Sequence, residues 1–199
     1  MTADPDNNNE LDALLMDRFA INRTTFVAAL KSIPPSRPWA VRLPEEDARL
    51  LDAADFPEDP SAALAAELQT AGGIGRLVNT AFTVAQVAQG LGITPARVRQ
   101  KRLARELWGI ANGQSWVFPV LQFDTDENGG PIQPVRGLEQ VFKVLPADLH
   151  PAAVAGFLFT QQPELYAEGR QMSPLEWLRS GGDITAVVAA ADAAYRYSQ

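Results

Sequence analysis

The residues with the clearest chemical potential are a group of Arg and Lys side chains in the middle of the chain. Between residues 76 and 105 there are six basic residues and no Asp or Glu. They are Arg76, Arg97, Arg99, Lys101, Arg102 and Arg105. Lys and Arg bind the phosphates of nucleic acids, and Arg also pairs with the guanine edge. The stretch therefore favours contact with DNA.

The rest of the chain has the opposite charge. The formal net charge of the whole chain is −7, and six of its 17 Lys and Arg residues lie in the basic stretch. That leaves 11 basic residues against 24 acidic ones elsewhere. One basic face on an acidic body would orient a protein on DNA, while the acidic remainder limits non-specific adhesion.

The side chains needed for most catalytic sites are scarce. The chain has no Cys and a single histidine, His150. Disulfides, thiolate metal sites and histidine clusters are therefore excluded. The sequence shows no Gly-rich phosphate loop and no carboxylate pair with a distinctive spacing. We expect no catalytic residues, no cofactor and no metal, and a protein that is not an enzyme.

Two short helices are expected to position the basic residues. Thr83 can cap the first helix, which ends near Gly92, a residue that accepts the positive φ of a tight turn. Thr94 can cap the second, with Pro95 at its first position. Val98 is the expected core contact of the second helix. The remaining faces then carry Arg97, Arg99, Gln100, Lys101, Arg102 and Arg105.

A hairpin is expected after these helices. Two short β-prone runs, 107–110 and 116–118, flank an Asn-Gly turn. The tip residues Asn112, Gln114 and Ser115 are candidate contacts to the DNA backbone or minor groove, and Arg76 is a candidate phosphate contact from the preceding segment. Thr83 and Thr94 complete the set of candidate DNA-binding residues.

Residues 82–123 resemble the excisionase-like and MerR-type helix-turn-helix families. The family pattern is matched by Thr83, Ala88, Leu91, Gly92, Ile93, Thr94, Val98 and Arg99. The resemblance implies a winged helix-turn-helix that binds double-stranded DNA through the second helix in the major groove. The alternative is a merely solvated basic helix face, which is disfavoured because a run of basic residues without a local acid repels itself.

The N-terminal third is predicted to be a disordered tail over residues 1–9 and a helical region over 10–75. Leucines and Phe19 at helical spacing indicate one helix, and Phe26 with Leu30 indicates a second. An extended connection is expected over 33–44, a helix start at Pro44, and a further helix from Ser61 that Gly72 and Gly73 break. Dimerisation, regulation and simple packing on the DNA-binding unit all remain open as the role of this region.

The C-terminal third is predicted to be helical over residues 134–199, after a polar connection over 124–134. The connection alternates Asp and Asn as a calcium loop does, but position 12 is Val135, so a plain turn is favoured. Further on, Ser173 and Pro174 can cap and begin a helix, and Asp183 can cap the last one.

Residues 150–195 resemble the C-terminal, toxin-binding region of the Xre/MbcA/ParS antitoxin family. The matching residues are Pro163, Leu165, Gly169, Pro174, Trp177, Leu178, Gly182 and Val187. The resemblance implies a toxin partner, with RES-type toxins, which degrade NAD, as the usual class. Core packing is the expected role of most of these residues. Trp177 and a free C-terminal tail that carries Tyr195, Arg196 and Tyr197 are the candidate toxin-binding residues.

The sequence thus predicts a mainly α fold: a helical N-terminal part, a winged helix-turn-helix over 76–123 with its β-hairpin, and a C-terminal toxin-binding or oligomerisation domain. The N-terminus lacks the pattern of a signal peptide, so we expect a cytoplasmic protein away from membranes. The expected function is that of a DNA-binding antitoxin of a type II toxin–antitoxin system, a homodimer that represses its own operon and neutralises a toxin. The alternative is a free-standing regulator whose C-terminal helices dimerise.

Overall fold

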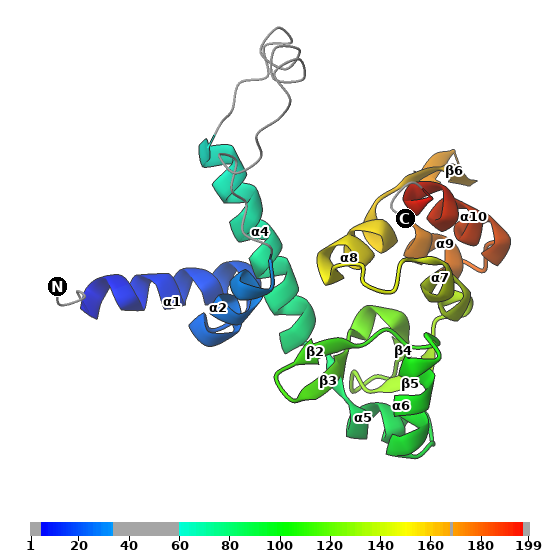
Figure 1. Cartoon of the computed structure of the whole chain (residues 1–199), viewed down its shortest axis with the longest axis horizontal. Coiled ribbons are helices and arrows are strands. Elements are labelled where there is room, and N and C mark those ends of the chain that lie inside the picture. Colours follow the sequence, from blue (N-terminus) through cyan, green and yellow to red (C-terminus); the bar gives the residue numbers. More distant parts are fainter. Residues whose placement is uncertain (1–4, 34–59, 168, 197–199) are drawn as a thin grey trace, which may run out of the picture. The chain divides into compact units, whose positions relative to one another are not determined.

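The computed structural model describes residues 5–33, 60–167 and 169–196. The expected extended connection from residue 34 onward and the helix start at Pro44 lie outside the described residues. The fold is mainly α, with small antiparallel sheets (Figure 1). The chain divides into two compact units, Met1–Arg76 and Leu77–Gln199. Among the described helices, none has the length and apolar content that a membrane span needs.

The first unit contains α1 (Pro5–Phe19), α2 (Arg23–Ser32) and α4 (Pro60–Asn79) as far as Arg76. The predicted disordered tail is wrong from Pro5 onward, where α1 begins, because proline is well tolerated in the first turn of a helix. The buried side chains of this unit include Leu15, Ile21 and Phe26. Part of the predicted leucine stripe does not pack, since Leu11 and Leu14 are exposed.

Helix α4 continues through the two glycines that were expected to break it. At Gly72 a Cβ atom would lie 2.4 Å from the Phe19 ring, and at Gly75 it would lie 2.7 Å from Ile21. Because the two glycines have no side chain, Phe19 and Ile21 can pack closely against α4. The sequence interpretation was wrong because it considered only the conformational freedom of glycine and not its small size.

The second unit begins with a three-stranded antiparallel sheet and two short helices. The strands are β1 (Phe82–Thr83), β2 (Ile110–Asn112) and β3 (Ser115–Phe118), in the order β1-β3-β2. Helices α5 (Val84–Gly90) and α6 (Pro95–Leu103) lie between β1 and β2 in sequence. Their core is formed by Phe82, Val87, Ala88, Val98, Leu107, Phe118 and Phe123. The two helices and the hairpin are present as predicted, but three details differ. Helix α6 ends at Leu103, before Arg105, and β2 begins only at Ile110. The loop of the hairpin is Gly113 and Gln114, because Asn112 already pairs with Ser115.

A second hairpin replaces the expected plain connection. A 3₁₀ turn (Val120–Gln122) leads into β4 (Phe123–Thr125), which pairs with β5 (Pro131–Pro134). At its tip the Asp126 carboxylate accepts hydrogen bonds from the backbone N–H groups of Asn128 and Gly130, at 2.9 and 2.8 Å. The polar residues thus form the turn itself, as expected, while the flanking strands were not predicted.

The remaining elements enclose a larger core. They are α7 (Leu138–Val144), α8 (Pro151–Phe159), the hairpin of β6 (Gln162–Ala167) and β7 (Arg170–Met172), α9 (Pro174–Arg179) and α10 (Ile184–Tyr195). The four helices agree with the predicted helical region, but the β6–β7 hairpin interrupts it and was not expected. Leu138, Leu158, Leu165 and Val187 are almost fully buried in this core.

Candidate nucleic-acid interface and candidate partner surface

Local hydrogen bonds fix the two helices that present the basic residues. The Thr83 hydroxyl accepts a bond from the Gln86 backbone N–H while the Gln86 side chain accepts one from the Thr83 N–H, which makes a capping box. Gly92 has φ of +63° in the turn. The Thr94 hydroxyl then accepts a bond from the Arg97 N–H at 3.2 Å. Both threonine side chains therefore act as helix caps.

The outer face of α6 is exposed and polar. Val98 is fully buried, which directs the opposite side of the helix to the surface. Arg97, Arg99 and Gln100 are exposed there, and the Arg97 guanidinium donates to the Gln100 side-chain oxygen at 3.2 Å. Within the described residues, Arg99 forms no ion pair or hydrogen bond through its side chain.

Leu103 lies on the same face and was missed by the sequence analysis. Its side chain is 71% exposed, and it follows Gln100 by three residues, so the two side chains are neighbours on the helix surface. The helical spacing could have indicated this exposure, because Leu103 follows Val98 by five residues and therefore lies away from the buried face.

Arg102 connects α6 to the β2–β3 hairpin. Its guanidinium carbon lies 3.7 Å from the centroid of the Trp116 ring, a cation–π arrangement. Gly109 lies against both side chains, since a Cβ atom there would be 2.9 Å from Arg102 and 3.2 Å from Trp116. The half-buried Arg102 therefore positions the hairpin beside the helix in addition to presenting a positive charge.

Two other candidate DNA-binding residues already interact with groups of the protein itself. Lys101 forms an ion pair with Glu106 at 2.7 Å, and Arg105 donates a hydrogen bond to the Leu145 carbonyl oxygen. The hydrogen bond and charge of Lys101 lower the pKa of the Glu106 carboxyl. The expectation that the basic run has no local acid is thus wrong, because Glu106 follows it directly. Lys101 and Arg105 are less available for phosphate than Arg99.

The tip of the β2–β3 hairpin is exposed. Asn112 pairs with Ser115 across a two-residue loop of Gly113 and Gln114, and Gly113 has φ of +60°. The Ser115 hydroxyl donates to the Asn112 carbonyl at 2.9 Å. All three predicted tip contacts, Asn112, Gln114 and Ser115, are therefore brought together at one accessible turn.

Arg76 lies in a different setting from the other candidates. It is the last residue of the first compact unit, where its guanidinium donates to the Arg18 carbonyl oxygen at 3.4 Å. Its contact with phosphate stays a prediction.

A buried glutamine, also missed from the sequence, holds the segment after α6. Gln122 is 1% exposed. Its side-chain oxygen accepts from the Trp108 N–H at 2.8 Å, and its side-chain nitrogen donates to the Trp108 carbonyl at 2.7 Å. Gln122 thereby fixes the path of the chain between α6 and β2. Nothing in the sequence separates this glutamine from an exposed one.

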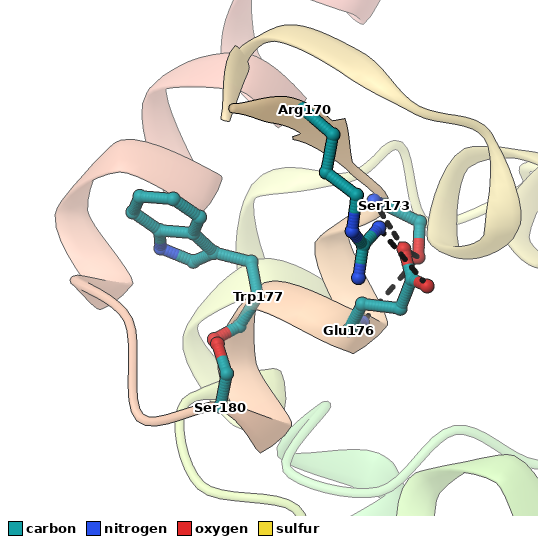
Figure 2. A network of polar contacts seen from close by, with 5 residues as sticks. All are labelled: Arg170, Ser173, Glu176, Trp177 and Ser180. Atoms are coloured by element: carbon teal, nitrogen blue, oxygen red, sulfur yellow. Dashed lines mark hydrogen bonds and ion pairs between the residues drawn. The ribbon is translucent and has the colours of Figure 1, made fainter. Parts of the chain in front are cut away.

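In the C-terminal part, a polar network orders the start of α9 (Figure 2). The Ser173 hydroxyl and backbone form a capping box with Glu176, which also lies 3.5 Å from the Arg170 guanidinium. The bonds from Ser173 and the charge of Arg170 lower the pKa of the Glu176 carboxyl. In Figure 2, Trp177 points away from this network.

Trp177 has a structural role at the end of α9. Its ring nitrogen donates to the Asp183 carbonyl at 2.9 Å, and a Cβ atom at Gly182 would lie 2.4 Å from the ring. The tryptophan therefore fixes the turn between α9 and α10. It remains half-buried, so part of its surface is accessible.

The predicted free C-terminal tail is wrong for its first residues. Helix α10 continues to Tyr195, whose ring packs on Phe157 with centroids 6.1 Å apart and whose hydroxyl donates to the Ala153 carbonyl at 3.3 Å. Burial raises the pKa of the Tyr195 phenol. Arg196 forms an ion pair with Asp192. The apolar ring therefore anchors the helix end to the core, and Tyr197 lies outside the described residues.

Two aromatic side chains that the sequence analysis did not select are exposed instead. Phe159, at the end of α8, is 57% exposed, and Tyr166, on β6, is 62% exposed. Neighbouring residues of a strand lie on opposite faces, so the exposure of Tyr166 beside the buried Leu165 would have been expected had the strand been recognised.

Comparison with protein-family models, curated proteins and solved structures finds no match to this chain.

Proposed function

We propose that the protein binds double-stranded DNA through a winged helix-turn-helix formed by residues 82–118. The observation that carries this proposal is the outer face of α6, on which Arg99, Gln100 and Leu103 are exposed. A short capped helix beside an antiparallel hairpin is the arrangement with which such proteins enter the major groove. In this assignment α6 is the recognition helix and the β2–β3 hairpin is the wing.

The exposed side chains have the chemistry of base recognition. Arg binds the two acceptors of guanine, and Gln binds the donor and acceptor of adenine. An exposed leucine, which is unfavourable in water, would contact the methyl group of thymine. The face thus combines charge, an amide and an apolar group, as sequence-specific contact requires, whereas a solvated helix face requires no exposed leucine.

Substitution on this face tests the proposal. Arg99→Ala and Gln100→Ala should each weaken binding to the preferred duplex by about 1–3 kcal/mol and relax sequence choice. The duplex is selected from a random-sequence library, and affinities are measured against a scrambled duplex of the same length. Arg136→Ala, which removes another exposed charge outside the two helices and the hairpin, is the control. Equal affinity of all four proteins for both duplexes contradicts the assignment.

The expected antitoxin activity is the more specific form of this proposal. It is supported by the exposed Phe159 and Tyr166 in the region that resembles the toxin-binding family. We propose that this region, rather than Tyr195, contacts the toxin. Tyr166→Ser should release toxin activity in a co-expression growth assay and leave DNA affinity unchanged, while Ser180→Ala, at an exposed position, serves as the control.

Assembly as a homodimer would place two recognition helices on half-sites about one helical turn apart. Exposed Leu11 and Leu14 in the first unit favour dimerisation as the role of that unit. The alternative is a free-standing regulator without a toxin. Copurification with the tagged protein distinguishes the two: recovery of DNA without a second protein supports the free-standing regulator.

A further inference from the structure

A pocket of about 340 Å³ lies within the second unit, where the end of α6, the β2–β3 hairpin and the α7–α8 connection meet. Its wall includes the aromatic rings of Trp108, Trp116 and Phe142 together with Leu145. Trp108 and Phe142 are in contact, with ring centroids 6.3 Å apart. This volume lies at the small end of the range for ligand sites, so the pocket could hold a single aromatic ring or two fused rings.

Two arginines, Arg102 and Arg105, line the same pocket. Among the described residues, no Asp or Glu lines it and neither arginine forms an ion pair. The nearest acid in sequence, Glu106, is paired with Lys101. Two positive groups beside apolar walls, without an acidic counterpart, form a site whose charge a bound anion would neutralise.

The backbone holds Arg105 in this position. Its φ is +57°, in the left-handed region that residues other than glycine rarely adopt, and it lies two residues after the end of α6 at Leu103. The guanidinium donates to the carbonyl of Leu145, which itself lines the pocket. A guanidinium has five N–H donors, so this bond leaves others for a ligand. Arg102 packs on the Trp116 ring and, among the described residues, forms no ion pair or side-chain hydrogen bond, so its N–H donors are available as well.

We propose that this pocket binds a small aromatic monocarboxylate, with the ring between the tryptophans and Phe142 and the carboxylate on Arg105 and Arg102. Binding of the ligand does not depend on the proposed function. A second consequence does rest on the proposed function: the ligand changes DNA affinity, because Arg102 and Trp116 join the recognition helix to the wing.

Isothermal titration of the full chain with 1-naphthoate tests the binding, with 1-naphthamide as the neutral probe of the same shape. We expect saturable binding of the acid, and binding of the amide weaker by roughly tenfold or more, since a charge-assisted bond is lost. Arg105→Gln should weaken naphthoate binding by a similar factor, and Arg102→Gln should weaken it less. Arg136→Gln, an exposed arginine that does not line the pocket, should leave it unchanged.

A second variant covers the possibility that Arg105→Gln fails to fold. Ala147 lines the pocket and is exposed, so Ala147→Trp fills the space without removing a buried contact. This variant should fold and lose naphthoate binding. The proposal is overturned if naphthoate does not saturate at millimolar concentration, if the amide binds equally well, or if Ala147→Trp binds like the unaltered protein.

DNA affinity with and without saturating naphthoate separates the two proposals. A change in affinity that Ala147→Trp abolishes supports the coupling. Binding of naphthoate by a protein that binds no duplex overturns the proposed function and leaves the pocket assigned. Binding of both, with DNA affinity unaltered by naphthoate, overturns the coupling alone.

Discussion

Three arginines in and just after α6 have different surroundings although they are the same residue type. Arg99 is exposed, whereas Arg102 packs on the Trp116 ring. Arg105 donates a hydrogen bond to the Leu145 carbonyl. The sequence predicted that the basic residues share a helix. It could not predict which of them are bound within the protein, because their partners come from distant parts of the chain.

Gln122 provides a test of stability at this scale. Gln122→Leu keeps a similar side-chain volume but leaves the part-buried N–H and carbonyl of Trp108 without their partner. The free energy of unfolding should fall by roughly 2–3 kcal/mol, because unsatisfied buried polar groups are costly. Urea unfolding followed by circular dichroism measures the change. Gln140→Leu, at an exposed position, is the control, and equal losses in the two variants would contradict the role of Gln122.

Glu106 provides a test of pH dependence. Its pKa is lowered by Lys101, so the ion pair contributes stability above the unfolded-state pKa of about 4.3 and loses it as the pH falls through the lower folded-state value. Glu106→Gln should therefore reduce stability at pH 7, and the difference from the unaltered protein should shrink toward pH 3. Urea midpoints across this range report it. Glu127→Gln, in an exposed turn, is the control variant.

At the scale of elements, caps and turns were the most predictive signals. Thr83, Thr94, Ser173 and Asp183 all cap the helices expected of them, because a cap is formed by residues close in sequence. The β4–β5 and β6–β7 hairpins were not predicted. Both are short, include proline and have an irregular register, so neither has the regular alternation that indicates a strand.

The adjacent glycines of α4 offer a matched pair of substitutions. Gly73→Ala meets no atom within 4 Å and should stabilise the helix by up to about 1 kcal/mol. Gly72→Ala gains the same propensity but meets the Phe19 ring, and the overpacking cost of about 1–3 kcal/mol should exceed that gain. Thermal unfolding of the two variants measures the difference. Equal stabilisation by both would show that α1 does not pack at Gly72.

At the scale of the whole molecule, charge is distributed unevenly. The net charge of −7 makes general attraction to DNA weak, so binding should depend on a few local phosphate contacts. With about three such contacts per chain, affinity should fall roughly 40-fold between 50 and 200 mM salt. Fluorescence anisotropy over a KCl series measures the slope. An affinity that is independent of salt would contradict binding through the basic face.

The two hydrogen bonds between the Gln122 side chain and the Trp108 backbone also restrict local motion. Trp108 lies outside every helix and strand, where backbone amides normally exchange their hydrogens with water quickly. Its amide, however, is bonded to a buried side chain, and Trp108 packs on Phe142 in the neighbouring core. Exchange there requires the α6–β2 junction to open. The Trp108 amide should therefore exchange as slowly as those of the sheet, and its rate reports how often this junction opens.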